Sequence, residues 1–316
     1  LAESQSQLQP LEHLIANYGD ATSTSFLDER FKLWRDMATG AAVAYVLGSG
    51  NYAIIAGNPL CDASQYYSIV TQFLQWLRQE TKRKPIWIIC SPEIESILGS
   101  KFGWRTLSPI ADEQVDPSRN QAAVDGEIAR KIRHAEAEGV KIVTLSQGEM
   151  VSDDIRRKID QRIQDWLSNR KGAQVHLSEV HPWRDHEHRW YFYAVDKNGR
   201  ICALVVLAQL APANGMQVKY SLDFPNAPNG VIEFIVTHAI QTAPRSGAKT
   251  FTFGAGATTE LTPGHNMNGA KVKMLQHTYE TLAKQFHLIR KSEFRGKLGA
   301  HDSPLYIAYP KHGLGS

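Results

Sequence analysis

The order of strand-like and helix-like segments repeats once along the chain, and this repeat constrains the fold more than any single motif does. Each half runs through a strand hairpin, a helix, a strand, a helix and a strand. Gly and Asn at 48–51, and Asn198-Gly199 in the second half, supply the positive φ that tight hairpin turns need. We therefore expect an α/β fold built from two copies of one unit, each a mixed sheet flanked by helices.

The element boundaries follow from apolar periodicity and from capping residues. Helices are expected at 11–18, 25–36, 64–81, 92–98, 124–138, 152–168, 230–241 and 271–285. Strands are expected at 41–47, 52–56, 86–90, 104–108, 140–145, 190–195, 201–210, 216–222, 250–253 and 305–309. The polar stretch 109–121 reads as a link, so the predicted domains are residues 1–120 and 121–316, the second carrying the catalytic pocket.

Composition excludes several classes of protein. A net charge of +3 does not mark a nucleic-acid binder, so only local basic patches can carry that argument. Three scattered cysteines without CxxC spacing argue against a disulfide framework or a zinc ribbon. No apolar run approaches the roughly 20 residues that a membrane-spanning helix needs.

Basic residues cluster near the C-terminus, directly before an apolar strand. Arg290, Lys291, Arg295 and Lys297 lie within eight positions of one another, and the strand at 305–309 follows. A cationic segment that leads into a buried strand can hold a phosphate-bearing substrate beside the core.

A second basic cluster lies on the predicted helix 124–138. Arg130, Lys131 and Arg133 are followed by His134, and Arg130, Arg133 and His134 share one side at i, i+3, i+4 spacing. Two interpretations are open: phosphate contact, or a solvated helix face balanced by neighbouring glutamates.

Two carboxylates are candidates for chemistry. Asp223 ends an apolar strand, where open α/β sheets form their ligand crevices. Glu233 lies in the first turns of the next helix, where it either takes part in the site or complements the helix dipole.

Two weaker patterns have simpler explanations. Gly254 and Gly256 could cradle a phosphate, but no helix start follows them, which favours a substrate-facing turn of small residues. His181, His186 and His188 could hold a metal, but no further ligand has diagnostic spacing, so a surface loop is favoured and no metal is expected.

Five segments together resemble, in order, the catalytic domain of the aminoacyl-phosphatidylglycerol synthases of the multiple peptide resistance factor family. They lie within residues 39–310 and are GNPL (57–60), RKIRHAEAEGV (130–140), LDFPNAPNGVIEF (222–234), KTFTFGAGA (249–257) and FRGKL…PLYIAYP (294–310). The resemblance implies tandem GNAT-like acyltransferase folds that use aminoacyl-tRNA as co-substrate. The sequence lacks the pyrophosphate loop of acetyltransferases, which agrees with no acetyl-CoA and no other cofactor.

The resemblance also implies residue roles. The family's pocket aspartate falls on Asp223, expected to anchor the α-ammonium or accept a proton, and its pocket lysine falls on Lys297, expected to hold a phosphate or the oxyanion. Departures from the family pattern occur at Asn226, Leu298 and Leu305, where the acceptor and the amino acid would be read. The residues expected to bind tRNA or substrate are Arg130, Lys131, Arg133, Lys291, Arg295, Asn226, Gly254 and Gly256.

These departures, and the absence of a membrane-spanning region ahead of the domain in this sequence, favour a branch of the family found in fungi. Such domains move aspartate or glycine from tRNA-Asp or tRNA-Gly to the 3β-hydroxyl of ergosterol, with or without a fused aminoacyl-tRNA synthetase. A cytoplasmic enzyme that contacts membranes peripherally is therefore expected. Aminoacyl-phosphatidylglycerol synthesis, and Fem-like or GNAT N-acyl transfer, are the alternatives.

Overall fold

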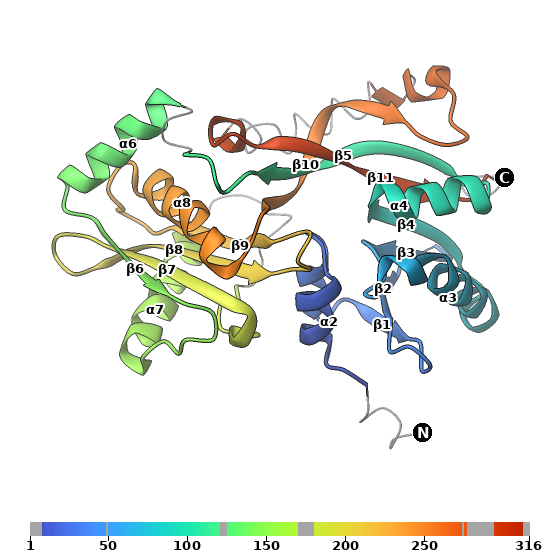
Figure 1. The fold of residues 1–316 in the computed structure, drawn as a ribbon, viewed down its shortest axis with the longest axis horizontal. Coiled ribbons are helices and arrows are strands. Elements are labelled where there is room, and N and C mark those ends of the chain that lie inside the picture. The colour runs from blue at the N-terminus through green and yellow to red at the C-terminus, as the bar shows by residue number, and fades with distance from the viewer. Residues whose placement is uncertain are drawn as a thin grey trace.

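The protein folds around one sheet of eleven strands. The computed structural model describes residues 8–48, 50–120, 125–169, 180–273, 275–276 and 294–311. Within these ranges the strand order is β1-β2-β3-β4-β11-β5-β10-β9-β8-β7-β6. Figure 1 shows the two halves side by side, joined across the top by the long strands β5, β10 and β11.

The first half packs helices on both faces of its strands. Val43 and Tyr45 of β2 pack against α3 and α4, whereas Ala42 and Ala44 face α2, because successive side chains of a strand point to opposite faces. Its elements are α2 (Leu11–Tyr18), η1 (Ser23–Leu27), β1 (Lys32–Arg35), β2 (Ala42–Leu47), β3 (Tyr52–Ala56), η2 (Ala63–Gln65), α3 (Tyr66–Thr81), β4 (Lys84–Cys90), α4 (Pro92–Ser96), η3 (Ile97–Lys101) and β5 (Arg105–Val115).

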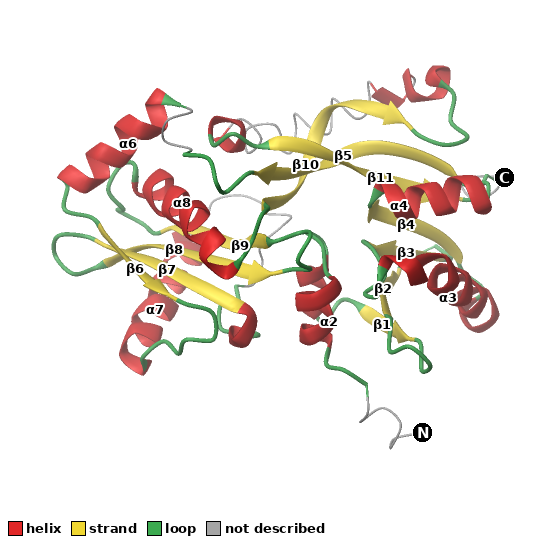
Figure 2. Cartoon of the chain, viewed as in Figure 1, coloured by secondary structure: helices red, strands yellow, loops and turns green. Residues whose placement is uncertain are grey.

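The second half is built in the same way. On β8, Val205 and Leu207 pack toward α6 and α8, while Leu204 and Val206 pack toward α7, as Figure 2 shows. Its elements are α6 (Gly126–Ala137), β6 (Lys141–Leu145), α7 (Asp153–Asn169), η4 (His186–His188), β7 (Arg189–Val195), β8 (Ile201–Gln209), β9 (Met216–Asp223), α8 (Val231–Thr242), η5 (Ala243–Ser246), β10 (Phe251–Pro263) and β11 (His301–Tyr309).

The two halves exchange strands. The C-terminal strand β11 lies between β4 and β5, and β5 of the first half pairs with β10 of the second. Each half also keeps one parallel pair, β3 with β4 and β9 with β10. The α/β fold of tandem GNAT-like units is confirmed. The division at residue 120 remains a prediction, since the sheet is continuous across it.

Two predicted elements are wrong. The helix expected at 25–36 is instead η1 followed by strand β1. The Asp28 carboxylate accepts a bond from the Arg30 backbone N–H at 3.1 Å, which favours a turn over a helix, and β1 then gains antiparallel pairing with β2.

The expected link at 109–121 is also wrong, because strand β5 continues to Val115. Its polar side chains are satisfied by distant segments: Asp112 accepts a bond from Thr252, and Glu113 is paired with Arg295. Such partners are invisible in the local sequence. The predicted helix 271–285 lies largely outside the described residues.

Candidate functional site

The parallel strands β9 and β10 pair at only two positions and then separate. Phe251 pairs with Met216 and Thr252 with Gln217. At this point β10 shifts register against β5, and Gly254 takes a left-handed conformation with φ of 88°. Backbone groups of two neighbouring strands are therefore free of each other inside the molecule, as in the crevices where α/β sheets bind ligands.

A cavity of about 700 Å³ occupies this gap, between the two halves. Its size is within the range of small-molecule sites. The cavity wall comes from the N-terminal segment, from strands β9 and β10, and from the segment before β7. The lining residues include Thr22, Thr24, Asp28, Arg30, Ile89, Glu113, Arg184, Arg189, Gln217, Val218, Lys219, Tyr220, Phe253, Gly254, Ala255, Gly256, Ala257 and Arg295.

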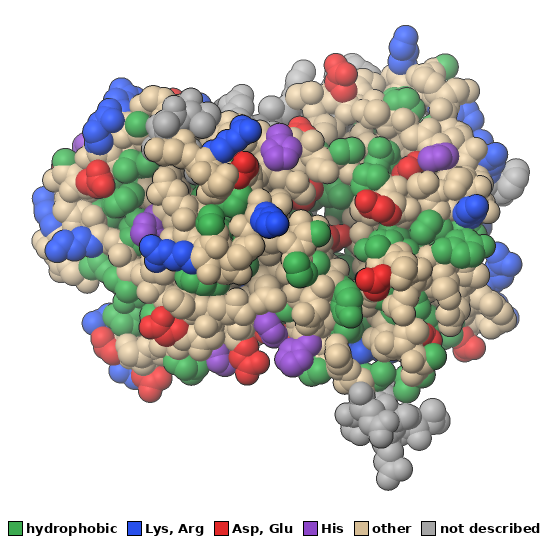
Figure 3. Space-filling model, in the orientation of Figure 1, with side chains coloured by type: hydrophobic (Ala, Val, Ile, Leu, Met, Phe, Trp, Pro, Cys, Tyr) green, Lys and Arg blue, Asp and Glu red, His purple; other side chains and the backbone are tan. Residues whose placement is uncertain are grey.

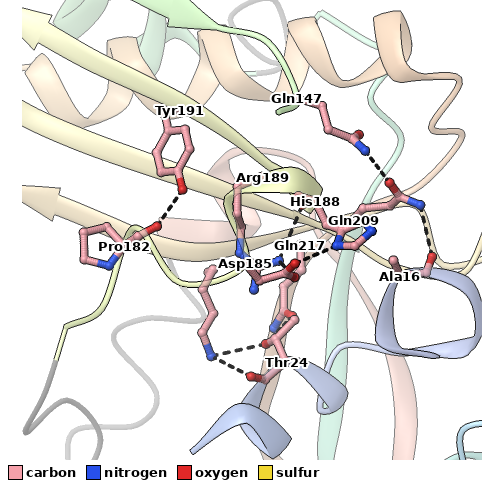
Figure 4. A network of polar contacts seen from close by, with 11 residues as sticks. Ala16, Thr24, Gln147, Pro182, Asp185, His188, Arg189, Tyr191, Gln209 and Gln217 are labelled. Carbon is pink, nitrogen blue, oxygen red and sulfur yellow. Dashed lines mark hydrogen bonds and ion pairs between the residues drawn. The ribbon is translucent and has the colours of Figure 1, made fainter. Parts of the chain in front are cut away.

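Hydrogen bonds hold the N-terminal wall against β9. Gln217 donates to the Ala21 carbonyl at 2.6 Å and accepts from the Thr24 hydroxyl at 3.0 Å. Asn214 donates to the Gly19 carbonyl at 2.8 Å. Figure 4 shows Gln217 and Thr24 meeting beneath this contact. The cavity is therefore a joint product of both halves.

The cavity wall carries several cations. Arg189 is 2% exposed, and its Nη1 lies 3.3 Å from Asp185 Oδ2, which Figure 4 shows. Arg295 is paired with buried Glu113 and lies over the Phe253 ring at 5.5 Å. Burial, with Arg189 and Arg184 nearby, lowers the pKa of Lys219 to about 8, while Asp28 acts in the opposite direction.

Three of the predicted binding residues line the cavity. Arg295 reaches it from the C-terminal segment, and Gly254 and Gly256 reach it from β10. The turn expected at these glycines is wrong, because both lie within a strand. A Cβ on Gly256 would meet the Glu113 carboxylate at 2.7 Å, so a small residue is required at this position.

The predicted catalytic residues lie outside the cavity wall. Asp223 is the exposed last residue of β9, paired with Ala203. Lys297 is half exposed, and its Nζ lies 2.6 Å from Glu127 of α6. No contact joins Asp223 to Lys297 within the described residues, so the structure does not bring them together. Their catalytic roles remain predictions.

Lys131 and Glu233, predicted separately, are brought together. Lys131 Nζ lies 2.7 Å from the buried Glu233 carboxylate and 3.4 Å from Glu127, which also binds Lys297. These four residues form an ion-pair chain that joins α6, α8 and the C-terminal segment. A Cβ on Gly230 would lie 2.1 Å from the Lys131 carbonyl, so α8 can begin this close to α6 only with glycine.

The remaining predicted residues lie at the surface or outside the described ranges. Arg130 and Arg133 are exposed on α6, and Figure 3 shows basic side chains along this edge. Asn226 adopts a positive φ of 63° after β9, and its carbonyl accepts a bond from Arg200 at 3.2 Å. Lys291 lies outside the described residues.

Two further predictions concern ligands and the acceptor pocket. The described residues bring no three His, Cys, Asp or Glu side chains together as metal ligands, and His188 Nδ1 is bonded to Asp185 at 2.6 Å. Leu298 is fully buried in the second-half core, and Leu305 lies in β11 beside Ile110. A direct reading of the acceptor by Leu298 is therefore wrong.

The sequence analysis missed Lys219, Arg189 and the N-terminal wall. A lysine and an arginine in otherwise apolar strands, in MQVKYSL and RWYFYAV, are the only local signals. The wall formed by 21–30 left no local signal, because its contacts with β9 span about 195 positions of the chain.

Beside the cavity, Asp20 is a buried acid whose ionisation opposes folding. Burial raises its pKa to about 6, against the stabilising bonds from Thr22 and Ser23. Because the folded-state pKa is raised, the favourable contribution is present below about pH 4 and is lost as pH rises through 6. Asp20→Asn keeps the bonded oxygen and removes the charge.

We therefore expect Asp20→Asn to stabilise the protein by at most about 3 kcal/mol at pH 7.5, with the gain vanishing near pH 4. Urea unfolding at both pH values measures this difference. Asp62→Asn is the control, since bonds from Ser64 lower the pKa of that exposed carboxyl. An equal gain at both pH values would contradict the assignment.

The comparisons with known proteins agree on one family. The sequence model of "Phosphatidylglycerol lysyltransferase, C-terminal" matches residues 12–292. No curated protein sequence matches the chain. Every helix in the described ranges is too short or too polar to cross a bilayer.

Solved structures share the fold over nearly the whole chain. The C-terminal domain of a putative lysylphosphatidylglycerol synthetase from Agrobacterium fabrum aligns with a TM-score of 0.75 at 17% identity, covering 98% of this chain and 92% of that one. L-PGS from Bacillus licheniformis gives 0.71 at 17% identity, covering 96% and 91%. A conserved protein of unknown function from Bacteroides thetaiotaomicron gives 0.56 at 11% identity, covering 89% and 85%. Since the family model spans most of its length, the chain belongs to the family of phosphatidylglycerol lysyltransferase C-terminal domains.

Proposed function

We propose that the chain transfers an aminoacyl group from aminoacyl-tRNA to a glycerol hydroxyl of phosphatidylglycerol, with the reaction in the cavity between the halves. The observation that carries the proposal is this cavity, which opens where β9 and β10 separate in a member of an aminoacyltransferase family. It has room for the end of a tRNA and a lipid headgroup to meet, and both walls carry polar groups.

The proposed reaction exchanges one ester for another. The acceptor hydroxyl oxygen attacks the aminoacyl carbonyl carbon, the bond to the tRNA ribose oxygen breaks, and that oxygen takes a proton as the hydroxyl loses its own. Bond energies nearly cancel, so holding the two substrates in line is the main task, and positioning can supply about 7–11 kcal/mol. A narrow cavity fixed by Gln217 and Thr24 is suited to such positioning.

Phosphatidylglycerol replaces ergosterol as the preferred acceptor. The family description and both lysylphosphatidylglycerol synthetase structures name that lipid, and no comparison names a sterol. Ergosterol, aspartate or glycine as the transferred amino acid, and a fused or associated synthetase have no support from the comparisons. They enter the tests only as alternatives.

Reconstitution tests the proposal. The purified chain is incubated with aminoacyl-tRNAs, each charged with one labelled amino acid, and with vesicles that contain either phosphatidylglycerol or ergosterol in a phosphatidylcholine background. We expect an aminoacylated phosphatidylglycerol by mass spectrometry. Product only from ergosterol vesicles would replace the acceptor, and no lipid product from any charged tRNA would refute the proposal.

We propose that the exposed basic face of α6 contacts the tRNA. Arg130 and Arg133 have no ion pair within the described residues, so their charges are available to phosphates. Removing both should make the salt dependence of deacylated tRNA binding shallower by about 1 to 2 in log–log slope. Filter binding at several salt concentrations measures this.

The matched control removes two exposed arginines elsewhere, Arg78 of α3 and Arg157 of α7. The total charge change is the same, so the slope should stay close to that of the unmodified chain. If both double variants change the slope equally, α6 has no special place in tRNA binding.

A further inference from the structure

The cavity holds an ammonium group without a carboxylate partner. Lys219 lies in β9, and its Nζ is 3.3 Å from both the carbonyl and the hydroxyl oxygen of Thr24. Within the described residues no carboxylate lies within ion-pair distance of Lys219, although most of its side chain is withdrawn from water. An ammonium has three donors, and two neutral oxygens neither use all of them nor balance the charge.

The charged groups that face Lys219 increase this imbalance. From β7, buried Arg189 adds positive potential, and so does Arg184 from the segment before it. Asp28, on the N-terminal wall, opposes them. Its carboxylate is already held by Arg30, through Nε at 3.1 Å and Nη2 at 2.8 Å.

The other charges of the cavity are committed or lie at the surface. Asp185 is shared between Arg189 and His188, and Glu113 is paired with Arg295. Glu29 and His181 are exposed where they line the cavity. The wall around Lys219 therefore keeps an excess of positive charge.

A buried cation in such surroundings is stabilised when an anion binds beside it. Arg184 donates one bond to the Leu27 carbonyl at 2.6 Å and retains further N–H groups, and it lines the same cavity. An anionic group seated between Lys219 and Arg184 would receive charge-assisted hydrogen bonds from both walls.

We propose that Lys219, with Arg184 and Arg189, forms an anion-binding subsite in the cavity that takes a phosphate or carboxylate group of a substrate. The two sources are the phosphodiester of a lipid headgroup and the side-chain carboxylate of an acidic aminoacyl group. Anion binding stands on the geometry alone, whereas the choice between these sources rests on the proposed function. A lysyl side chain is disfavoured at this subsite, because it would add a cation.

Binding of soluble anions to the full chain tests the subsite. The compounds are glycerophosphoglycerol, inorganic phosphate and aspartic acid 1-methyl ester, with lysine methyl ester as the cationic comparison, titrated by calorimetry at pH 6.5. We expect Lys219→Met to weaken anion binding about 10-fold or more. Lys249→Met, at an exposed lysine outside the cavity, should leave it unchanged.

Two readouts keep the test decisive if Lys219→Met fails to fold. Lys219→Arg retains the charge and should retain binding. In the unmodified chain, anion affinity should fall between pH 6.5 and 9.5, because the lysine loses its proton in that interval. Tighter binding of glycerophosphoglycerol identifies the headgroup, and tighter binding of the aspartyl ester identifies an acidic amino acid.

The proposal is overturned if no anion binds in a way that depends on Lys219, or if lysine methyl ester binds as well as the anions. Failure of the vesicle transfer assay would leave these titrations unaffected. Loss of transfer and loss of anion binding are thus separate results.

Discussion

Replacing Ala255 with tryptophan is expected to lower aminoacyl transfer by about 100-fold or more, because small displacements of reacting groups already cost that much. Ala255 lies on β10, lines the cavity and is exposed into it, so the indole occupies space that the substrates would need. The steady-state rate of aminoacyl-lipid formation measures the effect. Stability should change little, since the added ring enters open space.

Ala63→Trp is the matched control, since Ala63 is exposed in η2 of the first half and does not line the cavity. Its transfer rate should equal that of the unmodified chain. A near-normal rate with Ala255→Trp, in a protein that unfolds at the usual urea concentration, would place the reaction elsewhere.

Gly215→Ala is expected to destabilise the protein by about 3 kcal/mol or more, the sum of a left-handed backbone penalty and an overpacking penalty. Gly215 has φ of 71°, and a Cβ there would lie 1.9 Å from the Thr250 carbonyl oxygen. The same carbonyl accepts a bond from Met216 at 3.1 Å, where β9 and β10 begin to pair. The substitution would therefore disturb the closed end of the cavity.

Gly103→Ala separates the two penalties. Gly103 has φ of 68°, but nothing lies within 4 Å of its added Cβ. That variant should lose only about 1 kcal/mol, the conformational penalty alone. Urea unfolding of both variants gives the comparison. Equal losses would show that the close approach of β9 and β10 at Gly215 carries no energetic weight.

Local patterns were sufficient to predict the fold class. Helical periodicity in Tyr66–Thr81 and apolar runs such as Ile201–Gln209 depend on burial of one face or both, which the sequence shows directly. The strand exchange could not be predicted in this way. Strand β5 carries polar residues that only distant partners satisfy, so its sequence resembles a link.

The site was predicted less well than the fold, for a related reason. The cavity wall joins segments at 21–30, 181–189, 217–220 and 253–257, and no local rule connects them. The resemblance directed attention to Asp223 and Lys297, which the structure places outside that wall. Arg295, from the same C-terminal segment as Lys297, does reach the cavity and was included for its charge.

The central claim is that aminoacyl transfer takes place between the separated strands β9 and β10. The most direct measurement is a crystal structure with a non-hydrolysable 3′-aminoacylamido adenosine, a stable analogue of the charged tRNA end. The account predicts that the amide carbonyl lies in the cavity, in contact with residues from 217–220 and 253–257. An analogue bound instead beside Asp223 and Asn226, with the cavity empty, would contradict it.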